Sequence, residues 1–350
     1  MPTKYDPSVS SGTIAGVFPS MPQDSDWDDD VSREIPRSSP RAASGVYGAV
    51  PDAPPGSSDA DPADDLDDEE HEIEVVPVRR SLSLAIAGFA TLLTTALLLG
   101  TQTAGPDSRT PYAIVLFGVQ LLFVLAWTMA MRPPVPALVA GAAVVAAGLS
   151  AYVTAGGDGP RIMPLFLIGL GATVVVVAGQ FIARVDRLRV RDALGSTMLI
   201  TMGVVALSLL VPLTRRPVGT QAAVVCLAAA GFALIVARLV DAFFPKPRIA
   251  PQVARGAAGI IGGAMLGTLS GAALGSVLVL PFTPAKGAIL GLVAAGIAVL
   301  VDLAINFTEA GRAWPDEAPT FWLARHMQGP LGAFAAVAPA AYLLTIFVLT

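Results

Sequence analysis

Nine stretches of apolar residues, each close to 20 residues long, limit what this 350-residue chain can fold into. A helix needs about 20 apolar residues to cross the hydrocarbon core of a bilayer, and within that core only helices and closed barrels satisfy every backbone polar group. The stretches cover residues 82–100, 112–131, 135–154, 163–183, 193–212, 219–240, 257–281, 285–305 and 330–349. They predict an all-α polytopic membrane protein with about nine transmembrane helices.

Charge divides the chain into two parts. Residues 1–78 hold 18 of the 27 Asp and Glu residues and four Lys and Arg, a net charge of −14, while residues 79–350 carry a net charge of +9, giving −5 in total. Residues 1–78 are also rich in Pro, Ser and Gly, which predicts a disordered acidic tail. The simplest interpretation is a solvated tail, and the alternative is a docking segment for a protein partner. We expect residues 79–350 to form the transmembrane domain.

Basic residues distinguish the two sides of the predicted membrane domain. If the tail is cytoplasmic, 13 Lys and Arg fall on the cytoplasmic side and five on the outer side. Positive residues gather on the cytoplasmic side of membrane proteins, so the count predicts a cytoplasmic N-terminus. The basic stretch at Arg184, Arg187, Arg189 and Arg191 is a candidate contact for anionic lipid headgroups. We expect no nucleic-acid partner.

Glycines at every fourth position mark the stretch 257–281. They are Gly259, Gly263, Gly267, Gly271 and Gly275. Positions four apart share one face of a helix, and a glycine face in a membrane lets another helix approach closely. The pattern predicts the central, most tightly packed helix of the bundle. It suits packing within one chain and a homodimer equally well.

A few polar residues at membrane depth are candidates for a site. Asp241 ends one apolar stretch, Asp302 and Asn306 share a helix face near the end of another, and Arg255 precedes the glycine helix. Intramembrane ionisable residues favour a functional site, so we predict a polar pocket on the cytoplasmic side, with His326 in a nearby loop. The alternative is that Asp241 pairs with Arg238 and that Asp302 reaches water. The single cysteine, Cys226, and the two histidines rule out a zinc cluster, and Asp241 and Asp302 are the only plausible metal ligands.

From about Arg184 to Leu349 the order of motifs is that of a known enzyme family. A basic stretch is followed by Val240-Asp241-Ala-Phe-Phe, a short turn, the glycine-rich helix, and then Val301-Asp302-Leu303. The last helix carries Ala-Pro339-Ala-Ala-Tyr342. In this order the chain resembles phosphatidate cytidylyltransferase, the CDP-diacylglycerol synthase that joins CTP to phosphatidic acid in bacterial membranes. The resemblance implies a multi-pass protein of the bacterial plasma membrane, acting in phospholipid metabolism.

The chain departs from the family pattern at the chemistry. The family turn Ser-Pro-Gly-Lys-x-x-Glu-Gly becomes Gln252-Val-Ala-Arg255-Gly-Ala-Ala258-Gly259, and no Asp or Glu follows Glu317. Nucleotidyl transfer needs divalent cations held by oxygen ligands. We therefore expect a pseudoenzyme without a cofactor that binds anionic lipid or acts as a partner subunit in envelope or lipid metabolism. The alternatives are an active, divergent, Mg²⁺-dependent cytidylyltransferase and a small-solute transporter.

Overall fold

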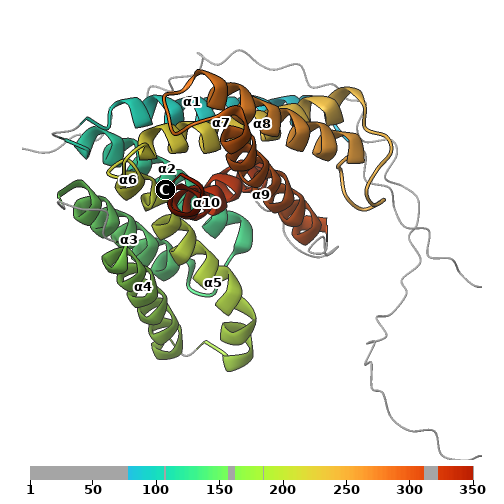
Figure 1. Ribbon diagram of the computed structural model, residues 1–350. Helices are drawn as coiled ribbons and strands as arrows, with labels where there is room; N and C mark the ends of the chain where they lie inside the picture. The colour runs from blue at the N-terminus through green and yellow to red at the C-terminus, as the bar shows by residue number, and fades with distance from the viewer. Residues whose placement is uncertain (1–77, 106–107, 157–161, 184, 311–321, 350) are drawn as a thin grey trace, which may run out of the picture. The chain divides into compact units, whose positions relative to one another are not determined.

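The computed structural model describes residues 78–105, 108–156, 162–183, 185–310 and 322–349. The prediction of an acidic tail falls almost entirely outside this part of the chain. Within it the structure is all-α, which confirms the predicted fold class (Figure 1). The helices are α1 (Arg80–Gln102), α2 (Thr110–Met131), α3 (Pro136–Gly156), α4 (Met163–Ile182), α5 (Arg187–Ser208), α6 (Leu210–Leu213), α7 (Gly219–Phe243), α8 (Ala257–Val277), α9 (Pro284–Ala310) and α10 (Trp322–Val348).

The described helices form nine spans that are long and apolar enough to cross a membrane. The four-residue α6 continues α5, and the two count as one span. This agrees with the predicted number of spans. The chain is therefore a multi-pass membrane protein, and its exposed Leu, Ile, Val and Phe side chains form the surface that a bilayer would cover.

The core of the bundle lies around α7 and α10. Helix α10 packs against α1, α2, α5, α6, α7 and α9, and Figure 1 views it almost end-on in the middle of these helices. In α7, 16 of 25 residues are buried. Among the largest fully buried side chains are Phe123 of α2 and Phe334 of α10, and the Phe123 ring stacks on Trp127 at 5.3 Å between centroids. Helices α7 and α10 therefore take the central place that the glycine pattern predicted for α8.

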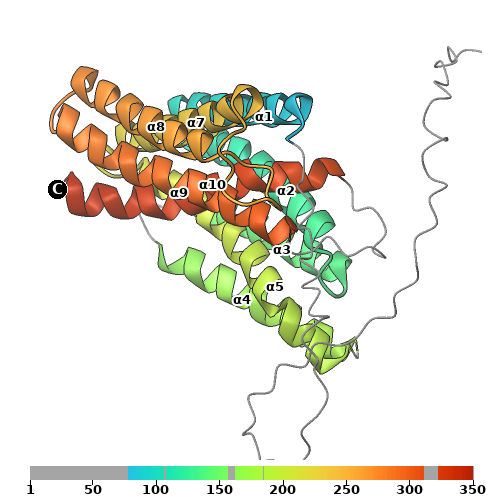
Figure 2. The same cartoon turned by 90° about the vertical axis from the view of Figure 1, so that its right-hand side faces the viewer.

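Helix α8 lies at the edge of the bundle, so the expectation of a central glycine helix is wrong. It packs against α7 and α9, as Figure 2 shows from the side, and its five buried residues are the five stripe glycines. Its other faces expose large apolar side chains such as Ile261, Met265 and Leu269. A glycine face permits close approach on one side of a helix, but it supplies no side chains to fill a core that surrounds the helix.

The neighbours of α8 carry small residues at the same spacing. On α7 these are Ala229, Ala233 and Ala237, and on α9 they are Gly287, Gly291 and Ala295. A Cβ added to Gly263 would lie 2.5 Å from the backbone oxygen of Ala233, and one added to Gly271 would lie 2.5 Å from that of Gly287. The stripe therefore packs backbone against backbone within one chain.

Two helices begin at least six residues earlier than the apolar pattern predicted. Helix α5 begins at Arg187 rather than at residue 193, because the Asp186 side chain caps it by accepting a hydrogen bond from the Leu188 amide at 3.3 Å. Helix α10 begins at Trp322 rather than at residue 330, and Pro330 lies inside it. The arginines at 187–191, which precede the predicted apolar stretch, and His326, which was predicted in a loop, are therefore helical.

Candidate functional site

Three segments bring four charged side chains together at one end of the bundle. Arg238 and Asp241 lie three residues apart near the end of α7 and so share a face of that helix. Asp302 lies on α9, and Arg255 lies in the connection 244–256 between α7 and α8. We call Arg238, Asp241, Arg255 and Asp302 the charge tetrad.

The tetrad is a chain of ion pairs with no net formal charge. Nη2 of Arg238 donates to Oδ1 of Asp302 at 2.6 Å. Nη2 of Arg255 lies 3.1 Å from Oδ2 of Asp302, and Nη1 of the same guanidinium lies 3.0 Å from Oδ2 of Asp241. Arg255 therefore lies between the two carboxylates and engages one with each arm of its fork.

All four members of the tetrad are buried. Arg255 and Asp302 are 0% exposed, Asp241 is 1% exposed and Arg238 is 6% exposed. Removing an ion from water costs several kcal/mol, and a buried pair offsets this cost only with close partners. Asp302 does not reach water, and Arg238 pairs with Asp302 across 64 residues of sequence, in place of the Asp241–Arg238 pair considered from the sequence.

The connection 244–256 folds back so that Arg255 points into the bundle. The Ala257 amide donates to the Pro247 carbonyl at 2.8 Å, and the Ile249 amide donates to the Arg255 carbonyl at 3.3 Å. The Gly256 amide donates to Oδ1 of Asp241 at 3.0 Å, which anchors the connection to the end of α7. Burial and then repulsion from Arg238 lower the pKa of Arg255 from its ordinary value, while Asp302 and Asp241 raise it.

Glycines make room for the two carboxylates. A Cβ on Gly259 would overlap Oδ1 of Asp241, and a Cβ on Gly329 of α10 would overlap Oδ1 of Asp302. The sequence motifs did not identify Gly329 or assign Arg238 to the site. A signal was present, because Gly329 and Gly332 lie three apart on α10 and therefore form a small-residue face.

The other predicted site residues lie around the tetrad or away from it. Asn306 is half-buried, and its amide donates to the backbone oxygen of Asp302 at 2.5 Å on the same helix. His326 is half-buried on α10, close enough to Arg238 to be affected by its charge. Arg187, Arg189 and Arg191 are exposed on the first two turns of α5, and Arg184 lies outside the described residues.

Most of the described basic residues lie at the same end as the tetrad. At this basic end lie the last residues of α2, α4, α7 and α9 and the first residues of α3, α5, α8 and α10. The side chain of Gln180, near the end of α4, donates a hydrogen bond of 3.2 Å to the carbonyl of Pro134, between α2 and α3. The basic end carries Arg79, Arg80, Arg132, Arg187, Arg189, Arg191, Arg238, Lys246, Arg248, Arg255 and Arg325. The opposite end carries Arg109, Arg215, Arg216 and Lys286 within the described part of the chain.

The donor set of the tetrad does not fit a Mg²⁺ ion. Such an ion takes carboxylate oxygens as ligands. Here Oδ1 of Asp302 and Oδ1 of Asp241 accept hydrogen bonds from Arg238 and the Gly256 amide, and the two Oδ2 atoms lie within ion-pair distance of Arg255. Among the described residues no group of three or more His, Cys, Asp and Glu side chains lies close enough to hold a metal. As placed, the carboxylates bind arginines, and no metal-dependent step follows from this geometry.

Comparisons with known proteins find no match among protein-family models, curated proteins or solved structures. The resemblance to phosphatidate cytidylyltransferase therefore remains a prediction from the motifs.

Proposed function

We propose that this protein is a non-catalytic membrane protein on a phosphatidate cytidylyltransferase-like scaffold, and that its basic end binds anionic lipid. The position of Arg255 between Asp241 and Asp302 carries the first half of this proposal. A cytidylyltransferase needs carboxylates that are free to hold divalent cations against the phosphates of CTP. Here Arg255 lies within ion-pair distance of both carboxylates that resemble the family motif, and together with Arg238 it balances their charge, so the geometry favours a structural role for them.

The tetrad supports this role because it joins three segments. The two ion pairs of Asp302 connect α9 to α7 and to the connection 244–256, and Asp241 connects that segment back to α7. Breaking a buried ion pair by removing one partner costs about 3–5 kcal/mol. The tetrad therefore holds these three segments together, which supports a structural role for its carboxylates.

The distribution of basic residues supports the second half of the proposal. Lys and Arg near a membrane surface attract anionic lipids by about 1 kcal/mol each. Arg187, Arg189 and Arg191 are exposed together at the start of α5, where headgroups can reach them. The excess of positive charge at this end also favours its placement in the cytoplasm.

A turnover assay tests the catalytic half. The purified protein in lipid would receive phosphatidic acid, Mg²⁺ and labelled CTP beside an active cytidylyltransferase. We expect no CDP-diacylglycerol from the protein and normal product from the control. Product that disappears in the Asp302→Asn variant would establish the alternative, an active cytidylyltransferase, and would contradict the proposal.

A lipid-enrichment assay tests the other half. The protein would be reconstituted in a mixture of phosphatidate and phosphatidylcholine, and the lipids retained on purification would be quantified. We expect phosphatidate to be enriched over phosphatidylcholine in the wild-type protein. The triple variant Arg187→Gln, Arg189→Gln, Arg191→Gln should lose about tenfold or more of this enrichment. Equal retention of both lipids by the wild-type protein would contradict the proposal.

A further inference from the structure

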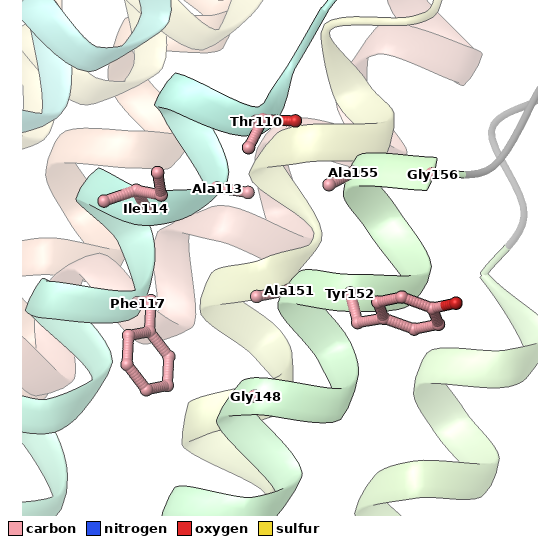
Figure 3. A pocket seen from close by; sticks show the side chains of 9 residues that line it. All are labelled: Thr110, Ala113, Ile114, Phe117, Gly148, Ala151, Tyr152, Ala155 and Gly156. Atoms are coloured by element: carbon pink, nitrogen blue, oxygen red, sulfur yellow. The ribbon is translucent and has the colours of Figure 1, made fainter.

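A long apolar groove lies between α2 and α3. Toward the end opposite the basic end it is lined by residues from Thr110 to Phe117 on α2 and from Gly148 to Gly156 on α3, with a volume of about 480 Å³ (Figure 3). Toward the basic end it is lined by residues from Leu121 to Arg132 and from Pro136 to Val144, with a volume of about 780 Å³. The lining positions recur every three or four residues, so one face of each helix forms the whole groove.

The two ends of the groove differ in charge. No charged residue lines the part of the groove away from the basic end. Figure 3 shows that the side chains lining this part include the hydroxyl groups of Thr110 and Tyr152. At the basic end, the exposed Arg132 closes the α2 wall. The floor between these ends is apolar, and it exposes side chains such as Leu125 and Met129.

Arg132 occupies a backbone conformation that favours glycine. Its φ of 43° and ψ of 56° are left-handed, and its amide caps α2 by donating to the Thr128 carbonyl at 3.1 Å. Glycine is the usual residue at this position after a helix, because a Cβ is strained there. Glycine at this position would relieve the strain, so Arg132→Gly removes the cation without imposing a new backbone conformation.

We propose that the groove holds an anionic phospholipid, with its phosphate on Arg132 and an acyl chain along the apolar floor. The acyl chain matches the apolar lining of the groove toward its basic end, and the phosphate matches Arg132, the one cation among the residues that line that part. This inference deepens the proposed function and rests on it, because it assigns the anionic lipid a place distinct from Arg187–Arg191.

Substitution of Arg132 tests the headgroup contact. The lipid-enrichment assay would compare Arg132→Gly, Arg132→Lys and, at the opposite end, Lys286→Gln. We expect Arg132→Gly to lose about fivefold of the phosphatidate enrichment. Arg132→Lys should keep most of it and Lys286→Gln should keep all of it. Because glycine relieves the left-handed strain, Arg132→Gly should melt at the same temperature or higher, which separates lost binding from lost folding.

Filling the groove tests the acyl-chain contact. Val144 lines the groove, whereas the neighbouring Val145 faces the other side of α3, toward α4. We expect Val144→Trp to reduce the enrichment several-fold, and Val145→Trp to leave it unchanged. Inorganic phosphate bound at Arg132 alone would be insensitive to Val144→Trp, so unchanged enrichment in that variant would overturn the acyl-chain assignment.

The failures of the two proposals are distinguishable. If the triple arginine variant of α5 loses enrichment and Arg132→Gly does not, the groove assignment is wrong and the lipid-binding function stands. If wild-type protein shows no enrichment at all, both are wrong.

Discussion

Arg255 is the residue on which the charge tetrad depends. It is the only tetrad member in contact with both carboxylates in the described structure, and it is fully buried. A guanidinium presents a planar fork with donors in two directions, whereas a lysine ammonium is a single point of charge. A lysine at position 255 would therefore not be equivalent to Arg255.

Replacement of Arg255 by methionine should destabilise the folded protein. The Arg255→Met variant leaves Asp241 buried without its ion pair and Asp302 with one partner, so we expect a loss of about 3–5 kcal/mol. Arg255→Lys should recover part of this loss, because the ammonium can reach one carboxylate at a time. Thermal melting in detergent measures both variants. Equal melting temperatures for wild type and Arg255→Met would show that the tetrad does not stabilise the fold.

A methyl group at Gly329 should disturb the tetrad from the side of α10. The Cβ of Gly329→Ala would overlap Oδ1 of Asp302, so we expect a loss of about 1–3 kcal/mol. Gly296→Ala on α9 is the matched control, because a Cβ there meets nothing within 4 Å. The same melting assay applies. A Gly329→Ala variant as stable as Gly296→Ala would mean that α10 yields at this contact.

At the scale of elements, the glycine helix is an edge helix that depends on two neighbours. Three sets of small residues at four-residue spacing, on α7, α8 and α9, hold these helices together backbone to backbone. The contact removes little apolar surface from lipid, so its stability comes from close packing along the whole stripe. One larger side chain in the stripe would separate the helices over several residues.

Two adjacent glycines of α8 provide a test of this packing. Gly263 is buried against α7, and its Cβ would lie 2.5 Å from the Ala233 oxygen, while the Cβ of Gly262 would meet only Val240 at 3.9 Å. We expect Gly263→Ala to lose about 1–3 kcal/mol. Gly262→Ala should gain up to about 1 kcal/mol from helix propensity. Melting temperatures that shift equally in both variants would contradict intramolecular packing of the stripe.

For the whole molecule, the arrangement of charges predicts an orientation. The basic end carries most of the described Lys and Arg, and the positive-inside tendency places that end in the cytoplasm. The nine membrane-crossing helices then put the start of α1 inside and the end of α10 outside.

Thiol labelling tests this orientation in cells. The single cysteine is buried, so a Cys226→Ser background accepts one new cysteine at either end. We expect a membrane-impermeant reagent to label Lys286→Cys in intact cells and to label Lys246→Cys only after lysis. The opposite pattern would invert the predicted topology.

The sequence predicted the number of spans, because nine apolar stretches of membrane length have few other solutions. It did not predict which helices are central, because the glycine pattern reports the closeness of a contact and not the number of neighbours. It selected Asp241, Arg255 and Asp302 as expensive groups at membrane depth, and the structure brings them together. It could not assign Arg238 to Asp302, since that pair depends on how α7 and α9 meet. The spacing of Gly329 and Gly332 indicates a small-residue face on α10 but does not show that this face meets Asp302.

The zero net formal charge of the tetrad has a consequence for energised membranes. A charge that moves across the full membrane potential gains or loses about 2.3 kcal/mol per 100 mV. The two arginines and two aspartates of the tetrad, if they move as one body, sum to zero and exchange almost no electrical work with that potential. The tetrad, whose members are the most buried charged side chains in the described part of the chain, should thus contribute almost nothing to any voltage dependence of the protein.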